Sequence, residues 1–160
     1  MSNTQDFFIK DVVSVDVLKA SDCHFPVPFN VPAIKSIPLS AMPIAYYNFG
    51  INLKLDATFN EEVDGDITIK SSNKKSVQGN IFTYDVTATI PSVSSFSDTI
   101  ESDLYHQDFH LIIHFADGTS KLCYGLPNTS IFTSSENLGS NSSNSIKITV
   151  QSMNKLIDII

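Results

Sequence analysis

Apolar and polar residues alternate over much of the chain, which is the pattern of β-strands with one buried and one exposed face. The first clear case lies near the N-terminus, where Val13, Val15 and Val17 share one face and Ser14 and Asp16 share the other. A period of two predicts a strand rather than a helix. The chain is therefore expected to enter its fold through a strand.

Alternation returns after Gly50 and predicts a meander of strands. A first strand covers residues 51–59 and is followed by a turn at 63–66. A second strand begins at Ile67, and a third covers residues 81–90 after a polar loop. Pro91 then ends the third strand, because proline cannot donate to a sheet ladder.

The second half of the chain predicts further strands. Asp117 and Gly118 suit a two-residue hairpin turn between two strands, since both tolerate positive φ angles. Further strands are expected near residues 130–133 and near residues 146–150. About 7–8 strands with little helix predict an all-β fold, namely an antiparallel β-sandwich or barrel.

One short segment, SVSSFSDTIESDL, breaks the period of two. Phe96, Ile100 and Leu104 are spaced by four there, which places them on one face of a helix. Ser95 and Ser97 are the candidate N-caps, because a serine hydroxyl accepts a bond from the first free backbone amides. The sequence therefore predicts one short helix.

A proline-rich segment separates the first strand from the meander. Five of the seven prolines lie between Pro26 and Pro43. Because proline fixes φ and lacks a backbone donor, this segment forms neither a helix nor a central strand. We expect an extended arm, and its apolar side chains predict that it covers either its own domain or a neighbouring subunit.

The expected organisation has three parts: an N-terminal strand and arm at 1–49, a β-sandwich domain at 50–152, and an apolar C-terminal tail at 153–160. We expect a chain that lacks residues 1–43 to keep a folded β domain but to lose assembly. The candidate subunit-interface residues are the apolar residues of the arm and the tail: Phe25, Val27, Phe29, Val31, Ile34, Ile37, Leu39, Leu156, Ile157 and Ile160.

Composition supports a folded chain and narrows its partners. Of 160 residues, 42% are hydrophobic and 17% are charged, which is too apolar for disorder. All 10 basic residues are lysine and the net charge is −7, so we expect no specific nucleic-acid binding. No secretory signal or apolar run of about 20 residues is present, so no membrane association is expected. Cys23 and Cys123 are expected to be reduced, with a disulfide only in an oxidising compartment.

Three of the four histidines, His106, His110 and His114, lie four residues apart in HQDFHLIIHF. On a helix they would stack into a metal site, but the apolar residues here alternate as in a strand. Residues four apart in a strand are roughly 13 Å apart, so the three imidazoles cannot share an ion. His106, Asp108 and His110 form at most a partial ligand set, and the favoured interpretation is a polar strand face against solvent or a subunit.

No motif of a known catalytic site is present, including GxSxG, GxGxxG, HExxH and CxxC. Serine, histidine and aspartate are all abundant, but their co-occurrence carries no information without geometry. We therefore expect no enzyme and no cofactor. The acidic cluster in EEVDGD lacks the spacing of a calcium loop and predicts a solvated turn at Glu61, Glu62, Asp64 and Asp66.

The order of elements in the second half is distinctive. A long alternating strand ends in TATIP at Ile90 and Pro91, a short helix follows, FHLIIHFADGTSKLCYGLP runs from Phe109 to Pro127, and IKITVQS closes the domain. Over residues 50–152 this order resembles small β-rich virion proteins of tailed bacteriophages, such as neck-ring, tail-completion and tail-tube components. It is most similar to structural proteins of gut Bacteroidales phages, including the crAss-like group.

The resemblance implies a non-enzymatic structural subunit of a phage neck or tail, made in the host cytoplasm. It implies a ring of identical subunits around the DNA channel, joined by sheet edges, loops and exchanged arms, with other virion proteins as neighbours. An acidic chain suits a channel wall past which DNA slides without binding.

The alternative is a carbohydrate-binding or adhesin-like β-sandwich. Such a module stacks sugars on exposed aromatic rings, yet this chain has no tryptophan. The aromatic residues with a polar group are its five tyrosines, Tyr46, Tyr47, Tyr84, Tyr105 and Tyr124. Binding on a glycan array would favour this alternative.

Overall fold

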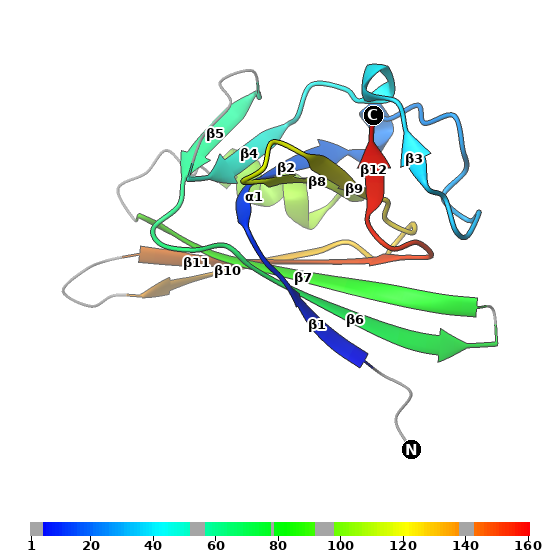
Figure 1. The fold of residues 1–160 in the computed structure, drawn as a ribbon. Helices are drawn as coiled ribbons and strands as arrows, with labels where there is room; N and C mark the ends of the chain where they lie inside the picture. The colour runs from blue at the N-terminus through cyan, green and yellow to red at the C-terminus, as the bar shows by residue number, and fades with distance from the viewer. Residues whose placement is uncertain (1–4, 52–56, 78, 92–97, 138–142) are drawn as a thin grey trace.

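The computed structural model describes residues 5–51, 57–77, 79–91, 98–137 and 143–160. Within these residues, strands form two stacked sheets (Figure 1). The five-stranded sheet has the order β1 (Gln5–Ile9), β6 (Thr68–Ser76), β7 (Gly79–Pro91), β11 (Ser143–Ser152) and β10 (Ile131–Asn137). The seven-stranded sheet has the order β3 (Ser36–Ile37), β12 (Ile157–Ile159), β9 (Ser120–Cys123), β8 (Phe109–Phe115), β2 (Val12–Lys19), β4 (Tyr47–Gly50) and β5 (Phe59–Glu62).

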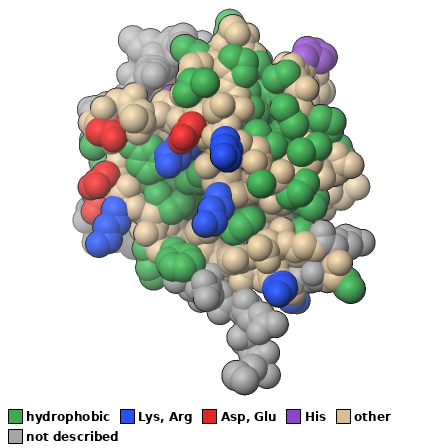
Figure 2. Space-filling model, turned by 45° about the vertical axis from the view of Figure 1, so that its right-hand side comes forward, with side chains coloured by type: hydrophobic (Ala, Val, Ile, Leu, Met, Phe, Trp, Pro, Cys, Tyr) green, Lys and Arg blue, Asp and Glu red, His purple; other side chains and the backbone are tan. Residues whose placement is uncertain are grey.

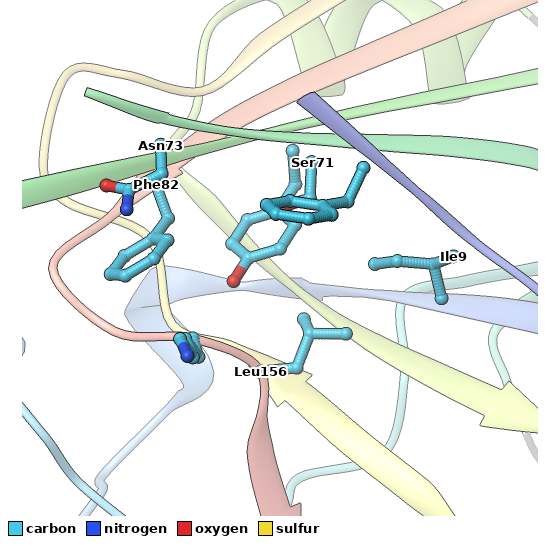
Figure 3. Close-up of a pocket in the computed structure, with 8 residues that line it drawn as sticks. Ile9, Ser71, Asn73, Phe82 and Leu156 are labelled. Atoms are coloured by element: carbon cyan, nitrogen blue, oxygen red, sulfur yellow. The ribbon is translucent and has the colours of Figure 1, made fainter. Parts of the chain in front are cut away.

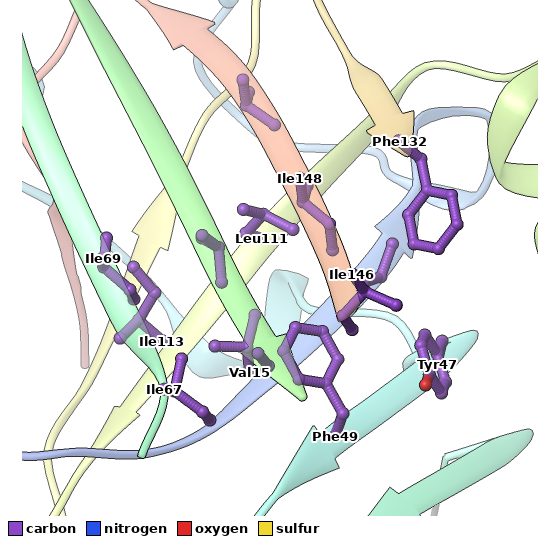
Figure 4. Packing of buried hydrophobic residues seen from close by; sticks show 14 of the residues in the cluster. Val15, Tyr47, Phe49, Ile67, Ile69, Leu111, Ile113, Phe132, Ile146 and Ile148 are labelled. Carbon is purple, nitrogen blue, oxygen red and sulfur yellow. The ribbon is translucent and has the colours of Figure 1, made fainter. Parts of the chain in front are cut away.

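The main core fills the space between the two sheets (Figure 4). Burial alternates along β7, whose inward positions are all apolar while the residues between them are half-buried. The facing strand β8 contributes Phe109, Leu111 and Ile113, which are fully buried. The predicted all-β sandwich is therefore confirmed, since each of the two sheets turns one apolar face into this core.

The strand count and two pairings differ from the prediction. The described residues form 12 strands rather than 7–8, because short strands from both termini, the arm and the 59–62 segment complete the sheets. Two pairs, β4 with β5 and β3 with β12, are parallel. The strand predicted at 51–59 is wrong at both ends, since β4 stops at Gly50 and β5 begins at Phe59; residues 52–56 lie outside the described residues.

Gly50 is required where β4 passes β2. A side-chain carbon at this position would collide with the backbone carbonyl of Val13 and with Ser14. The backbone of β2 bulges between Val12 and Ser14, so Val12 takes the core position expected for Val13. This bulge explains why a strand was correctly predicted here while its first inward residue was not.

The N-terminal strand lies in the interior of the seven-stranded sheet. Strand β2 pairs with β8 on one side and with β4 on the other. Its residues Val15 and Val17 are fully buried in the main core, while Leu18 is fully buried on the opposite face. The segments 1–49 and 50–152 thus share one sheet, and the tail joins it through β12, which pairs with β9 and β3.

The proline-rich arm lies on the outer face of the seven-stranded sheet. Two 3-10 turns, η1 (Ala20–Asp22) and η2 (Leu39–Ala41), flank the part that contains most of the prolines. Beneath the arm is a second buried cluster of apolar residues from the arm, the sheet and the tail: Leu18, Ile37, Ala45, Ile112, Leu122, Tyr124 and Ile157. The arm was expected to cover either its own domain or a neighbouring subunit, and in the structure it covers its own domain.

Asn154 fastens the arm to the end of β11. Its side-chain oxygen accepts the backbone N–H of Ile34 at 2.7 Å, and its amide donates to the carbonyl of Val31 at 2.9 Å. Tyr124 donates its hydroxyl to the carbonyl of Val27 at 2.8 Å. Because prolines leave neighbouring carbonyls without regular partners, these side chains satisfy backbone groups that no sheet ladder satisfies.

The helix α1 (Asp98–Tyr105) matches the described part of the predicted helix and continues one residue past its predicted end. Ile100 and Leu104 are buried in the main core as expected, and Tyr105 contacts Phe132 of β10 edge to face. Asp103 accepts the hydroxyl of Tyr46 at 2.6 Å, which joins the helix to the seven-stranded sheet. The predicted residues Ser95, Phe96 and Ser97 lie outside the described residues.

The hairpin at Asp117 and Gly118 is confirmed, but its loop has three residues rather than two. The N–H of Phe115 donates to the carbonyl of Thr119 at 2.9 Å, so residues 116–118 form the loop. Gly118 adopts φ of +90°, a value that favours glycine. The acidic turn also differs in part, because Glu61 is buried in β5 while Glu62, Asp64 and Asp66 are exposed.

The central position of β2 reverses the expectation for a truncated chain. Deleting residues 1–43 removes Val15, Val17 and Leu18, each worth about 1.5–3 kcal/mol of burial, along with two strand ladders. Since a domain has about 5–15 kcal/mol of net stability, we predict that this chain does not fold. Circular dichroism and urea unfolding would test this, and a cooperative transition would contradict it. A control that lacks only residues 1–4 keeps every described strand.

Candidate functional site

The strand β8 is buried on both faces, so its two histidines, His110 and His114, do not form a solvent-exposed strand face. Its odd positions point into the main core, while His110, Ile112 and His114 point to the outer face of the sheet. The arm covers His110 and Ile112 there. This face was expected to meet water or a neighbouring subunit, but for these two residues it meets the chain's own arm.

His110 is enclosed by aromatic rings. The ring centroids of Phe25 and Tyr124 lie 5.5 Å and 5.0 Å from its own, and its Nδ1 accepts the backbone N–H of Gly125 at 2.9 Å. Burial lowers the pKa of His110 from 6.5 to about 4, because desolvation of the charged ring outweighs the nearby charge of Asp108. His110 is therefore a neutral structural residue at neutral pH.

The structure does not assemble His106, Asp108 and His110 into a ligand set. His106 lies beyond the end of α1 and is exposed, and both carboxylate oxygens of Asp108 accept the backbone N–H of Asn128 at 3.1 Å. Among the described residues, no group of three histidine, cysteine, aspartate or glutamate side chains is placed to hold a metal ion. The ring of His110 is already engaged by Gly125.

His114 has a different environment at the other end of β8. Its Nε2 lies 2.7 Å from Oδ2 of Asp16 on β2, and its Nδ1 lies 2.7 Å from Oγ of Ser120 on β9. The buried side chain of Asn48 donates to the other oxygen of Asp16. Three adjacent strands thus place an aspartate, a histidine and a serine in one hydrogen-bonded line.

Asp16 and Ser120 were not predicted from the sequence as the partners of His114. Asp16 was correctly placed on the polar face of its strand, but the neighbouring strand was not known. A two-residue turn would have placed Lys121 opposite His114, whereas the three-residue loop pairs His114 with Ser120. Because a shift of one residue exchanges the faces of a strand, the register decides which side chain meets the imidazole.

A groove of about 630 Å³ opens beside this line of residues. Asp16, His114 and Ser120 all contribute to its lining. The rest of the lining comes from the arm, β8, the β8–β9 loop and the C-terminal segment with β12: Leu39, Met42, Pro43, Ile44, Ala45, Ile112, Gly118, Thr119, Ile159 and Ile160. The groove is therefore apolar over much of its wall and polar where the histidine lies.

A second pocket of about 370 Å³ lies beside the edge strand β1 (Figure 3). Phe7, Ile9, Phe82 and Leu156 give it apolar walls, together with Ser71, Asn73, Tyr84 and Lys155. Burial raises the pKa of Tyr84, whose hydroxyl donates to the carbonyl of Asn154 at 3.2 Å. Its mainly apolar walls fit the binding of an apolar group.

The ten candidate interface residues divide into three groups. Ile37 and Ile157 are fully buried in the second cluster, and Phe25, Val27, Ile34 and Leu156 are half-buried. Only four are exposed: Phe29, Val31, Leu39 and Ile160. Figure 2 shows a face of the molecule on which hydrophobic side chains form several patches between separated lysines.

The two cysteines are not bonded to each other. Cys23 donates its thiol to the carbonyl of Lys19 at 3.4 Å, and burial raises its pKa to about 12. Cys123 is buried in the main core, which also raises its pKa. Neither thiol is a ready nucleophile at neutral pH, since the thiolate is the reactive form.

No protein-family model, curated protein or solved structure matches the chain. In the described part of the chain, no helix has both the length and the apolar character needed to cross a bilayer.

The low pKa of His110 predicts a loss of stability in acid. The folded state keeps this ring neutral down to about pH 4, while the unfolded chain protonates it near pH 6.5. Between these two pH values the unfolded state therefore binds more protons than the folded state. The free energy of unfolding falls by up to about 3 kcal/mol as the pH is lowered through this range. Replacing His110→Gln keeps an acceptor for Gly125 but removes the titration.

Urea unfolding at pH 7 and at pH 4.5 would measure this contribution. We expect the wild type to lose about 2–3 kcal/mol more than the His110→Gln chain over this interval. Carboxylates whose pKa is lowered, such as Asp103 and Asp117, titrate equally in both chains and cancel in the comparison. Equal losses in the two chains would show that His110 is not held neutral.

Proposed function

We propose that the chain is a structural subunit of a tailed-phage virion and joins copies of itself into a ring of the neck or tail. The proposal takes its setting from the resemblance over residues 50–152 and its mode of contact from the sheet edges. Ring subunits need two open, complementary surfaces on each copy, because a head-to-tail contact uses a different patch on each side.

The observation that carries the proposal is an aromatic pair on an open sheet edge. Strand β1 pairs only with β6 among the described residues. Phe7 and Phe8 of β1 are 57% and 65% exposed, on opposite faces of the strand. An exposed edge with large apolar side chains is a template for pairing with another chain, and proteins that remain monomeric avoid it.

The edges of the seven-stranded sheet are protected by comparison. At one end, β3 has only two residues and is followed directly by Pro38. At the other end, β5 has four residues and finishes at Glu61 and Glu62. Short strands, prolines and charges are the usual protections of an edge. The difference between the sheets favours the five-stranded sheet as the one that assembles.

The opposite edge of the five-stranded sheet is β10. Its first residue, Ile131, is 55% exposed. All four pairings in this sheet are antiparallel, so β1 and β10 run in the same direction. If β1 of one copy met β10 of the next, the new pair would be parallel and the sheet would continue from copy to copy. Such a contact forms a closed ring where the rotation between copies closes.

The arm has a smaller part in this proposal than the sequence suggested. Ile37 and Ile157 are fully buried on the chain's own sheet, and Asn154 fastens the arm there. An exchanged arm would have to release these contacts on its own sheet and remake them on a neighbouring copy, whereas the described edge of β1 needs no such rearrangement to pair. We therefore assign assembly to the sheet edges and leave the arm as the cover of its own domain.

The carbohydrate-binding alternative receives less support. A sugar-stacking platform needs solvent-facing aromatic rings, usually of tryptophan or tyrosine. The chain has no tryptophan, and all five tyrosines belong to the described residues. Tyr47, Tyr84 and Tyr124 are buried, and Tyr46 is half-buried. Tyr105 is exposed, but its ring contacts Phe132 and its hydroxyl donates to Glu101 at 2.8 Å.

Charge substitutions at two equally exposed apolar positions would test the proposed interface. We expect the wild type to form a defined oligomer in native mass spectrometry and light scattering. Phe8→Glu introduces a charge on the open edge and should raise the dissociation constant at least about 10-fold. Leu39→Glu is a matched control on the arm, because Leu39 is 66% exposed and Phe8 is 65% exposed.

The two variants separate the edge from the arm. Dissociation by Leu39→Glu, with Phe8→Glu still assembled, would return the interface to the arm. A wild-type chain that stays monomeric at high concentration would end the ring proposal. Circular dichroism of both variants checks that they fold. Substitutions at exposed positions of this kind change the free energy of unfolding by no more than about 0.5 kcal/mol.

A further inference from the structure

The line Asp16–His114–Ser120 has the connectivity of a nucleophilic serine site. We propose that Ser120 is a nucleophile toward carboxylic esters of apolar acids, with His114 as its general base and Asp16 as the residue that positions the base. The inference rests on the geometry of three side chains in one groove and does not depend on assembly. It also goes against the expectation of no enzyme, which was drawn without knowledge of which strands are neighbours.

The hydrogen bonds define which ring nitrogen acts as the base. Asp16 is acceptor-only as a carboxylate, so the Nε2 atom 2.7 Å from it carries the proton and donates. The neutral ring then has its lone pair on Nδ1, which lies 2.7 Å from Oγ of Ser120. The serine hydroxyl donates to this lone pair. A nucleophile, a base within hydrogen-bond distance and a third group that orients the base are the parts of such a site.

The carboxylate of Asp16 is held in place on both sides. Asn48 is fully buried on β4 and donates to Oδ1, while Oδ2 faces His114. The side chains of Asp16 and His114 are only 13% and 11% exposed. A partly desolvated carboxylate stabilises an imidazolium more than a solvated one does, because the surrounding dielectric is lower.

The sheet fixes the distances in this line. Ser120 and His114 are direct cross-strand partners of β9 and β8, so their side chains leave the same face. The cross-strand partner of His114 on the next strand, β2, is Ser14. Asp16 lies two residues further along β2 and so has its side chain on the same face. Sites built on strands keep their geometry better than sites on loops.

The groove indicates the class of substrate. Leu39, Ile44 and Ile160 on its rim are 66%, 73% and 75% exposed, so apolar side chains face an open space beside the reactive atoms. The lining also includes the exposed loop residues Gly118 and Thr119 next to Ser120. An ester with an apolar acyl chain matches this wall, and its carbonyl would lie against Ser120.

The reaction balances without a cofactor. Oγ of Ser120 bonds to the ester carbonyl carbon, and its proton passes to Nδ1 of His114. The bond between that carbon and the alcohol oxygen breaks, and the alcohol leaves with the proton from His114. Water then gives a proton to His114 and bonds to the acyl carbon. The bond to Ser120 breaks, Ser120 regains its proton, and the carboxylic acid is released.

A fluorophosphonate probe and p-nitrophenyl butyrate would test the full-length chain. We expect stoichiometric labelling by the probe that maps to Ser120. We also expect a burst of p-nitrophenol, released when the ester acylates Ser120. Ser120→Ala should lose both signals, and His114→Ala should slow labelling by about 10²-fold or more. Free imidazole should restore part of that rate, which a residue of purely structural importance would not allow.

Asp16→Asn tests the positioning role separately. The Nε2 proton of His114 should give a downfield proton resonance in the wild type and in Ser120→Ala. The Asp16→Asn chain should lose this resonance, and the probe should label it at least about 10-fold more slowly than the wild type. Ser72→Ala is the matched control, since Ser72 is a half-buried serine on β6 of the other sheet. It should label like the wild type.

Three results would overturn the proposal. The first is no labelling of the folded wild type above the level of the urea-unfolded chain. The second is labelling that Ser120→Ala leaves unchanged or that maps to another serine. The third is a His114→Ala chain, shown to be folded by circular dichroism, that labels at the wild-type rate. None of these results bears on ring assembly, which the Phe8→Glu comparison measures.

Discussion

The structure depends on covering both faces of the seven-stranded sheet. Strands β2 and β8 at its centre carry apolar residues on both sides, with Val17 and Leu111 toward one core and Leu18 and Ile112 toward the other. The five-stranded sheet covers the first face. The second face needs another cover, because an exposed apolar sheet face of this size would associate with other surfaces. The proline-rich arm supplies it.

Proline suits this covering role for physical reasons. Apart from the two-residue strand β3, this segment lies over the sheet without extending its ladder. Proline disfavours both further strand pairing and a helix, because it fixes φ and removes donors. The remaining backbone groups then need side-chain partners, which Asn154 and Tyr124 provide to Val31, Ile34 and Val27. Burial under this cover is also what keeps His110 neutral, since the arm residue Phe25 lies against its ring.

Much of the fold was predictable because alternation is a local signal. The strands β7 and β11 alternate in burial as their sequences predict, and the helix keeps Ile100 and Leu104 inward. The strand β8 lies where it was predicted but is buried on both faces. Pairing between distant strands was not predictable, because nothing local tells β2 that β8 will be its neighbour. The candidate site depends on two such facts: the β2–β8 pairing and a three-residue loop that brings Ser120 rather than Lys121 opposite His114.

The edge proposed for assembly and the site proposed for chemistry lie on different sheets. The outer face of the five-stranded sheet is polar, with Thr149 donating to Asp85 at 2.6 Å, and its edges are where apolar side chains remain exposed. The seven-stranded sheet has protected edges and a covered face, and the groove at His114 opens beside that cover. The aromatic edge belongs to one sheet and the serine to the other. A ring built through the edges of one sheet therefore leaves the groove of the other sheet open, and each surface can be changed without altering the other.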